Sequence, residues 1–406
     1  MLQLTEHSQS QPVCLTIAQQ LKLQQWFRAD IEPAENGLVR VTPGSRVGGA
    51  DLDGLKVSVG PKTPVYRLLT MISEIADPYD WLDVDAAIRS KHDISDALAA
   101  LFIQACHRTF EQGMHRSYRR ERQRLGFVRG KLLIPQTIRQ LTPVPVTVET
   151  DVFDDDTPEN QILAAVLRKL RTDPHLSDAT RQQAHHIFRN VRHVASLRDP
   201  LRTANNIAWT RHNQWYRQAV SLATMILSFG RVDHELGAET VPGFFIDMPK
   251  LIEHWVRVTL RRAWGLNQHE MRNSWNGYLW LDETRRVQLQ PDLAVQRAGI
   301  WTFVGDVKYK VLPQHSMRNT GADRNDIYQT LAYLTATGLQ EGVLIYAGIG
   351  ATDETITIKR LGARIHIISL DLSNRDAKNK LIQKTQRLQS LKTSRSRSRS
   401  DFHVHT

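Results

Sequence analysis

The stretch from Val287 to Lys310 constrains the fold of this chain more than any other. Apolar and polar residues alternate on both sides of Arg297-Ala298-Gly299, which is typical of two antiparallel strands joined by a tight turn. Asp292 belongs to the first predicted strand, and Asp306 and Lys308 belong to the second. Successive side chains of a strand point to opposite faces. The pattern therefore predicts a hairpin on which Asp306 and Lys308 share one face.

These three side chains suit one kind of chemistry. Two carboxylates at one edge form half of a Mg²⁺ site, because that ion keeps several waters and takes its remaining ligands from a substrate phosphate. Lys308 could then orient an attacking water, lower its pKa, or offset charge on the phosphorane. The same residues also fit a surface hairpin with an ordinary Asp/Lys pair, so the short pattern alone leaves both interpretations open.

The flanking segments favour the first interpretation. An apolar stripe with helical spacing runs from residue 251 to about 265 and carries Glu253. Downstream, a second predicted helix can be capped by Asp323 or Asn325. A buried strand is predicted at residues 343–346. The predicted order is therefore helix, hairpin plus a third strand, helix and strand.

Two resemblances follow from these motifs. The arrangement of Pro-Asp, thirteen residues and Asp-x-Lys resembles the PD-(D/E)xK nuclease superfamily. The segments FFIDMPKLIEHWV, PDLAV, GDVKYK and DIYQTLAY resemble the McrC family, the nuclease subunit of McrBC-type modification-dependent (5-methylcytosine) restriction systems. The second resemblance covers about residues 240–350, and the segments GMHRSYRRE and VRGKL extend it loosely upstream.

The McrC resemblance implies a role for each of several residues. Asp292 and Asp306 would ligate Mg²⁺, and Lys308 would be the catalytic lysine. The resemblance adds three further site residues: Glu253 as a third metal ligand, and Gln329 with Tyr333 as residues that shape the site. A solvated helix acid at Glu253 and an aromatic packed on the sheet at Tyr333 remain alternatives.

The resemblance also implies an activity and its partners. The chain would hydrolyse modified double-stranded DNA when activated by a separate AAA+ GTPase of the McrB type. Gly54 to Lys62 is the stretch nearest to a P-loop, and its spacing is wrong, so the chain should not hydrolyse nucleotide itself. Two alternatives remain: a noncatalytic adaptor that stimulates the motor, and a standalone repair or transposon-associated nuclease of the same superfamily.

The expected fold class is α/β. A restriction-endonuclease-like domain of the PD-(D/E)xK type, with a mixed sheet flanked by helices, is expected at residues 236–372. A mixed α+β region that docks on the partner should occupy residues 1–150, and a helical region should occupy residues 151–235. Composition predicts a basic disordered tail at residues 373–406.

Local patterns predict further elements in the first two regions. Short alternations predict strands between residues 38 and 59. Helices are predicted at residues 17–27, after Gly60-Pro61-Lys62, from 95–106 continuing into a long helix at 110–125, after Thr157-Pro158, at 178–197 and at 213–228.

The charge is distributed unevenly. The net charge is +11, and residues 375–406 hold nine Lys and Arg against two Asp, so most of the excess lies in the tail. A second concentration of arginine between residues 108 and 131 includes Arg116, Arg119 and Arg120. This cluster could follow DNA phosphates, contact a partner's nucleotide, or be a solvated helix face.

The sequence also indicates in which cellular compartment the chain is expected. No run of about 18 apolar residues and no signal-like start is present, so a cytoplasmic chain with no membrane partner is expected. Cys14 and Cys106 lack any metal-binding spacing and are expected to be core thiols.

Overall fold

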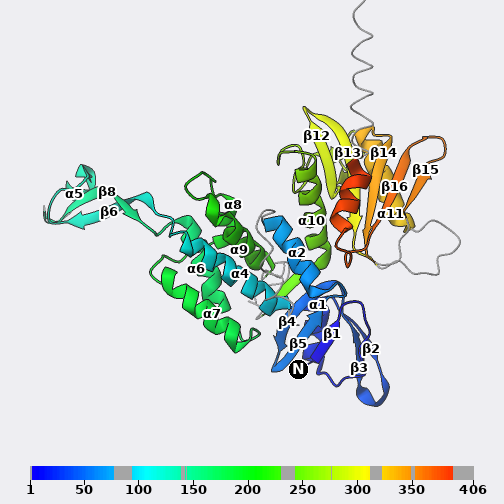
Figure 1. Ribbon diagram of the computed structural model, residues 1–406, viewed down its shortest axis with the longest axis horizontal. Helices are drawn as coiled ribbons and strands as arrows, with labels where there is room; N and C mark the ends of the chain where they lie inside the picture. Colours follow the sequence, from blue (N-terminus) through cyan, green and yellow to red (C-terminus); the bar gives the residue numbers. More distant parts are fainter. Residues whose placement is uncertain are drawn as a thin grey trace, which may run out of the picture. The chain divides into compact units, whose positions relative to one another are not determined.

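The computed structural model describes residues 2–76, 94–138, 142, 144–229, 243–275, 277–310, 322–348 and 353–386 (Figure 1). The chain forms two compact units. Unit 1 comprises Met1–Val47, Ser58–Trp81 and Ile246–Thr406, and unit 2 comprises Gly48–Val57 and Leu82–Phe245. These boundaries differ from the four consecutive segments expected from the sequence, because unit 1 combines pieces from both ends of the chain.

A five-stranded mixed sheet forms the C-terminal part of unit 1. Its order is β12 (Leu293–Arg297), β13 (Ile300–Lys308), β14 (Glu341–Ala347), β16 (Arg364–Leu370) and β15 (Glu354–Thr357). The β12–β13 pair is antiparallel, β13, β14 and β16 are parallel, and β15 is antiparallel to β16. The predicted hairpin and the following strand are therefore confirmed.

Two helices pack against this sheet. Helix α10 (Met248–Ala263) begins at the N-cap Asp247 and contacts β13. Helix α11 (Arg324–Thr337) begins at the N-cap Asp323, ends at Gly338, and contacts β13, β14 and β16. A short hairpin of β10 (Leu279–Trp280) and β11 (Gln288–Leu289) precedes β12. The helix, hairpin, helix and strand of the predicted order are thus present.

The N-terminal segments form strands and two helices. A four-stranded sheet has the order β1 (Leu2–Thr5), β5 (Leu55–Gly60), β4 (Arg46–Leu52) and β9 (Gly243–Asp247). Strands β2 (Asp30–Pro33) and β3 (Val39–Thr42) form a separate pair, joined by the 3-10 turn η1 (Glu35–Gly37). Helix α1 (Ile17–Phe27) has a capping box made by Thr16 and Gln19, and α2 (Val65–Ala76) packs on α10. The helix predicted at residues 17–27, the strands predicted between residues 38 and 59 and the helix predicted after Gly60-Pro61-Lys62 are confirmed, whereas β1, β2 and β9 were not predicted.

Unit 2 is built on helices whose apolar faces meet. They are α4 (Ile94–Glu111), α6 (Pro158–Leu170), α7 (Asp178–Phe188), α8 (Pro200–Asn205) and α9 (Arg217–Phe229), with the 3-10 turns η2 (Arg189–Val191) and η3 (Gln214–Tyr216). Thr157 caps α6 and Pro158 occupies its first turn, as predicted. The helix predicted to reach residue 197 ends earlier, at Phe188, and continues as η2.

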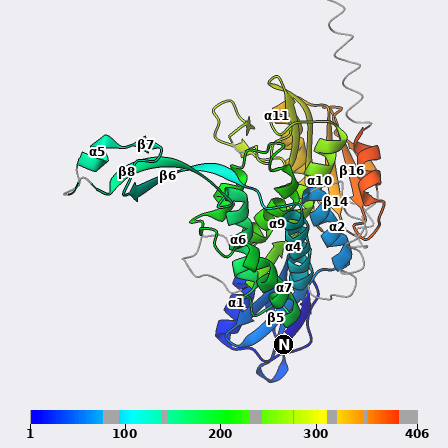
Figure 2. The same ribbon diagram turned by 60° about the vertical axis from the view of Figure 1, so that its left-hand side comes forward.

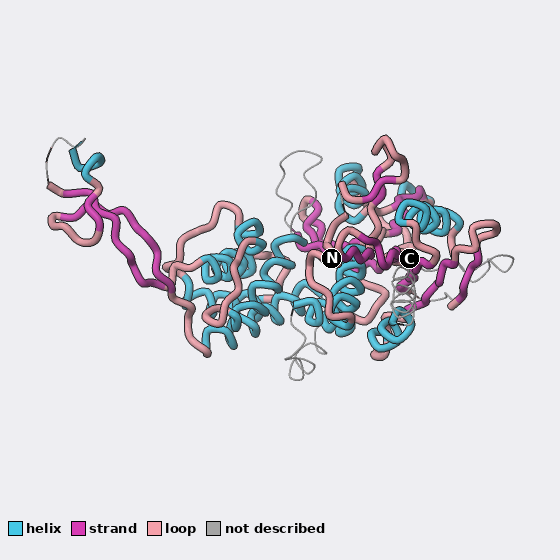
Figure 3. The backbone as a smooth tube through the Cα atoms, turned by 90° about the horizontal axis from the view of Figure 1, so that it is seen from above, coloured by secondary structure: helices cyan, strands magenta, loops and turns pink. Residues whose placement is uncertain are grey.

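An arm of three strands projects from these helices (Figures 1 and 2). Its order is β6 (Ser117–Leu125), β8 (Val146–Asp154) and β7 (Lys131–Leu132), and the short helix α5 (Ile134–Ile138) lies near its tip (Figure 3). The predicted helix at residues 110–125 is therefore wrong. Helix α4 stops at Glu111, Gly113 follows with φ +102, and residues 117–125 pair with β8 along their whole length.

Three smaller findings complete the fold. Residues 377–386 are helical, and Ala377 and Leu381 in this stretch are buried, so the predicted disorder does not begin at residue 373. Residues 387–406 lie outside the described residues.

Cys106 is buried as predicted, whereas Cys14 is exposed. Within the described part of the chain, no helix combines the length and the apolar character needed to cross a membrane.

Candidate active site

The structure brings Asp292, Asp306 and Lys308 together at the β12–β13 hairpin. Leu293 is paired with Gly305 in the antiparallel ladder. Asp292 and Asp306 lie beyond this pair at the same end, so they lie across from each other. The Val307 N–H donates to Oδ2 of Asp292 at 2.9 Å. The Lys308 Nζ lies 2.6 Å from Oδ2 of Asp306. The shared face predicted for Asp306 and Lys308 is therefore real.

Gly305, the residue before Asp306, allows β13 and β14 to lie unusually close together. A Cβ built on Gly305 would lie 2.8 Å from the carbonyl oxygen of Val343, which is its partner on the parallel strand β14. Real Cβ atoms essentially never come so close, so β13 and β14 can approach this tightly only with glycine at this position. The close approach helps to hold Asp306 fully buried, with no exposed surface.

Burial and mutual repulsion change the protonation of the carboxylates. Burial, and then the neighbouring Asp292, raise the pKa of Asp306 to about 7. Burial, and then Glu253, raise the pKa of Asp292. Burial by itself lowers the pKa of Lys308, but the carboxylates of Asp306, Asp326 and Asp292 outweigh it and raise the pKa. Buried carboxylates thus repel one another beside Lys308, an arrangement that favours a bound cation.

Glu253 lies on α10 and interacts with this centre electrostatically. Burial raises its pKa, Arg257 opposes that shift, and Asp306 adds to it. Arg257, one helical turn further on, donates from Nε to the carbonyl oxygen of Asp292 at 3.1 Å. Sequence reasoning missed Arg257, although its i+4 spacing from Glu253 was a usable signal.

The donor set fits a hard divalent cation. Carboxylate oxygens are the ligands that Mg²⁺ prefers, and the ion commonly takes only one or two of them from a protein. Among the described residues, no three His, Cys, Asp or Glu side chains form a group that could hold a metal ion. Asp292 and Asp306 thus offer a partial site, and Glu253 as a third ligand stays a prediction.

Gln329 and Tyr333 on α11 complete the surroundings of the lysine. Lys308 Nζ donates to Oε1 of Gln329 at 2.9 Å, and Nε2 of Gln329 donates to the Tyr333 hydroxyl at 2.7 Å. That hydroxyl donates to the Gln290 carbonyl oxygen at 3.1 Å and lies 3.5 Å from Asp306 Oδ1. Tyr333 also packs in the core cluster of this unit, so its packing is observed, and its role in shaping an active site stays a prediction.

Asp326 is a site residue that the sequence did not reveal. Only 4% of it is exposed. It accepts from the Tyr346 hydroxyl at 2.7 Å and from Lys310 Nζ at 3.1 Å, and it lies 3.9 Å from Lys308 Nζ. No local spacing in the sequence points to Asp326, because its contact with Lys308 joins α11 to β13.

The arginine cluster lies in unit 2, on or next to β6. Arg116 stacks over the Phe153 ring at 5.1 Å, Arg119 is 3.0 Å from Asp154, and Arg120 is 3.6 Å from Asp151. The alternative of a solvated helix face is therefore wrong, because this segment is a strand whose arginines face acids of β8.

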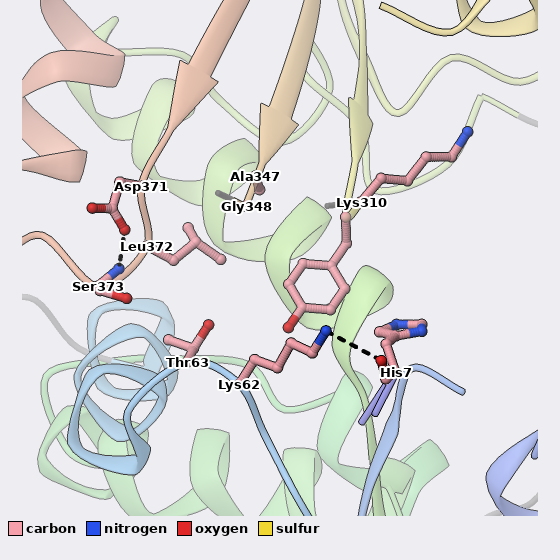
Figure 4. A pocket seen from close by; sticks show the side chains of 10 residues that line it. His7, Lys62, Thr63, Lys310, Ala347, Gly348, Asp371, Leu372 and Ser373 are labelled. Atoms are coloured by element: carbon pink, nitrogen blue, oxygen red, sulfur yellow. Dashed lines mark hydrogen bonds between the residues drawn. The ribbon is translucent and has the colours of Figure 1, made fainter. Parts of the chain in front are cut away.

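A second concave feature of unit 1 is a cavity at the carboxyl ends of β13, β14 and β16 (Figure 4). Its volume is about 40 Å³. Ligand pockets are commonly several hundred Å³, so this space is too small for a nucleotide. Lys62 Nζ donates across its rim to the His7 carbonyl oxygen at 3.3 Å. The carboxylate centre remains the candidate active site.

Fold and site together define an α/β protein whose mixed sheet carries an aspartate–aspartate–lysine centre. A family model described as the McrBC 5-methylcytosine restriction system component matches residues 41–347. The match spans most of the sequence, so the chain belongs to this family. The motifs that suggested a McrC-like chain are thereby confirmed at the level of the family.

Two solved structures are similar to this chain. A chain in the refined half-complex from the tetradecameric assembly of Thermococcus gammatolerans McrB AAA+ hexamers with bound McrC has a TM-score of 0.57 at 17% identity, covering 95% of this chain and 99% of that one. At this identity the likeness shows a shared fold. A chain in the Thermococcus gammatolerans McrBC complex has a TM-score of 0.45 at 21% identity, covering 65% and 88%. No curated protein matches.

Proposed function

We propose that this chain is the nuclease subunit of its restriction system and hydrolyses DNA phosphodiesters with Mg²⁺. The observation that carries the proposal is the pairing of buried Asp306 with Asp292 beside Lys308. The segment from α10 to β14 would then be a PD-(D/E)xK domain. An intact centre argues against a noncatalytic adaptor, which has no need for buried carboxylates with raised pKa values.

The chain's own residues would divide the work as follows. Asp292 and Asp306 would hold Mg²⁺, with Glu253 as a further candidate ligand, and the ion would supply Lewis-acid stabilisation of the phosphate charge. Lys308, held by Gln329 at 2.9 Å, would orient the attacking water and offset charge on the phosphorane. Tyr333 would fix Gln329 and hence the lysine.

We further propose that the arm of unit 2 docks on an AAA+ GTPase, as McrC is bound to McrB AAA+ hexamers in the similar structure. Large apolar side chains are strongly exposed on the arm: Phe127 at 66%, Val128 at 58%, Ile134 at 56%, Ile138 at 75% and Val144 at 57%. Such a concentration is typical of an interaction site. The partner would recognise modified double-stranded DNA, which would place the chain in the cytoplasm.

The test combines cleavage and motor stimulation. Lys308→Ala should abolish cleavage of methylated plasmid by chain plus GTPase partner in Mg²⁺ buffer, while stimulated GTP turnover persists. Lys359→Ala, at an exposed position in the same unit, should leave both unchanged. If Lys308→Ala cleaves at the wild-type rate, Lys308 is not the catalytic lysine. Stimulated GTP turnover without any cleavage by the wild-type chain would identify an adaptor.

A further inference from the structure

The β10–β11 hairpin carries an apolar face beyond the core. Leu279 is paired with Leu289, and both pack in the core of unit 1. Leu281 N donates to the Val287 carbonyl oxygen at 2.9 Å, so the ladder continues by one more pair. Because side chains alternate along a strand, Leu281 and Val287 extend the face of Leu279 and Leu289. Yet they are 41% and 48% exposed.

The loop that closes this hairpin is ordered by one aspartate. Oδ1 of Asp282 accepts from the backbone N–H groups of Arg286 at 2.9 Å and Val287 at 2.7 Å. Arg285 N donates to the Asp282 carbonyl oxygen at 3.2 Å, and Arg285 has φ 56. Arg285 and Arg286 are both exposed. Two guanidiniums are thus presented on a preformed turn, which lowers the entropic cost of binding.

The hairpin is joined directly to the candidate active site. Asp292 is the third residue after Leu289, so it lies within about 10 Å of the end of β11 even along a fully extended chain. The intervening Gln290 accepts a hydrogen bond from Tyr333 at 3.1 Å, and Tyr333 also contacts Asp306. If a phosphodiester of duplex DNA lies at the centre, neighbouring phosphates of the same duplex would lie at the hairpin, because backbone phosphates recur every few Å along DNA.

We propose that the β10–β11 hairpin is a DNA-binding element beside the active site. Arg285 and Arg286 contact backbone phosphates, and Leu281 with Val287 packs against sugars at the groove edge. The inference rests on the proposed nuclease function. Duplex DNA fits better than a protein partner, because adjacent arginines complement a polyanion and the hairpin leads within three residues to Asp292, where a phosphodiester would be cut.

The test uses the full chain with Asp306→Ala, which prevents cleavage during the measurement. Affinity for a fluorescently labelled duplex is measured by anisotropy over a series of salt concentrations. Arg285→Gln with Arg286→Gln should reduce the slope of log affinity against log salt by about 1.8, or about 0.9 for each lost phosphate contact. Leu281→Ser with Val287→Ser should weaken binding at every salt concentration and keep the slope.

The matched control is Lys359→Gln with Arg360→Gln. This exposed pair carries the same charge but follows β15, at the opposite edge of the five-stranded sheet from β12. Its salt slope should not change. An unchanged slope in the hairpin arginine variant, an equal drop in the control, or no duplex binding by the parent chain would each overturn the proposal.

Two further outcomes separate this inference from the proposed function. Hairpin variants that lose binding to the GTPase partner while keeping DNA affinity would show that the hairpin docks a protein, which also overturns it. A wild-type chain that never cleaves, but whose DNA affinity responds to the hairpin variants as expected, would refute the nuclease function and leave the DNA-binding element supported.

Discussion

Asp306 lies fully buried beside Asp292, and the pKa of its carboxyl is raised to about 7 by burial and then by that neighbour. A carboxyl with a higher pKa in the folded chain takes up a proton on folding. Its contribution to stability is therefore fully present below the ordinary pKa near 3.8 and is lost as pH rises through about 7. At neutral and higher pH, the metal-free centre costs folding free energy.

Asp306→Asn should remove this titration. In metal-free buffer, the free energy of unfolding of the variant relative to wild type should rise with pH across that window, by on the order of 4 kcal/mol. Urea unfolding at several pH values measures it. If the difference in free energy of unfolding between the two proteins does not change with pH, the pKa of Asp306 is not raised by burial.

Asp326 should act by holding Lys308 and Lys310 in place. Asp326→Asn keeps an acceptor for the Tyr346 hydroxyl but removes the charge that faces both lysines. We expect kcat for DNA cleavage to fall by about tenfold, which corresponds to about 1.4 kcal/mol, with KM little changed. Asp326→Glu should restore part of the rate.

Asp323→Asn is the control for that experiment, since Asp323 caps the same helix and Asn caps helices equally well. It should cleave at nearly the wild-type rate. A loss that is confined to KM, or equal losses in both variants, would count against a positioning role for Asp326.

The sequence predicted one part of the site well for a physical reason. Asp306 and Lys308 are two residues apart on one strand, and the strand period alone puts them on one face. Their geometric neighbours on α11 are different. Asp326 reaches Lys308 from a helix, across a tertiary contact that no local period encodes, and its hydrogen bond with Tyr346 depends on how α11 lies over β14.

At the scale of elements, β6 shows why local patterns can mislead. Its residues SYRRERQRL are rich in good helix formers, and they follow a helix directly. Their partner strand, β8, lies about 30 residues further along the chain and supplies an acid opposite Arg120 and another opposite Arg122. Those cross-strand pairs, rather than intrinsic preference, select the strand. Helices α10 and α11 and strand β13 carry local sequence signals and were predicted from them, whereas strands β8 and β16 were not predicted.

The arm as a docking element leads to a prediction about its tip. Phe127→Ser with Ile138→Ser should reduce stimulation of the partner's GTP turnover by about tenfold or more, because exposed apolar anchors dominate such interfaces. The melting temperature should barely change, since both side chains are mostly exposed. Charge reversal at Arg116, Arg119 and Arg120 should also weaken stimulation, in a salt-dependent way.

The control for the arm is Ile300→Ser, which alters an equally exposed side chain in unit 1. It should leave GTP turnover intact. Full stimulation by the double tip variant, measured at partner concentrations below saturation, would remove the arm from the interface.

At the scale of the whole molecule, Mg²⁺ should stabilise the chain even without DNA or partner. Ligand that binds only the folded state adds about 2.7 kcal/mol at a hundredfold excess over Kd. The melting temperature of the wild-type chain should therefore rise with Mg²⁺ concentration. Asp292→Ala with Asp306→Ala should show no such rise. An equal response in both proteins would mean that the ion binds elsewhere.

Unit 1 is assembled from segments at both ends of the chain, with most of unit 2 lying between them. Glu6 accepts a hydrogen bond from Tyr309, which directly follows Lys308, and these partners are 303 residues apart. At about 5–20 residues per second, a ribosome needs on the order of 15–60 s to separate their synthesis. The N-terminal segment that carries Glu6 is therefore synthesised that much earlier than the segment that carries Tyr309. A nascent chain can therefore present the arm and the helices of unit 2 well before the aspartate–aspartate–lysine centre of unit 1 is complete.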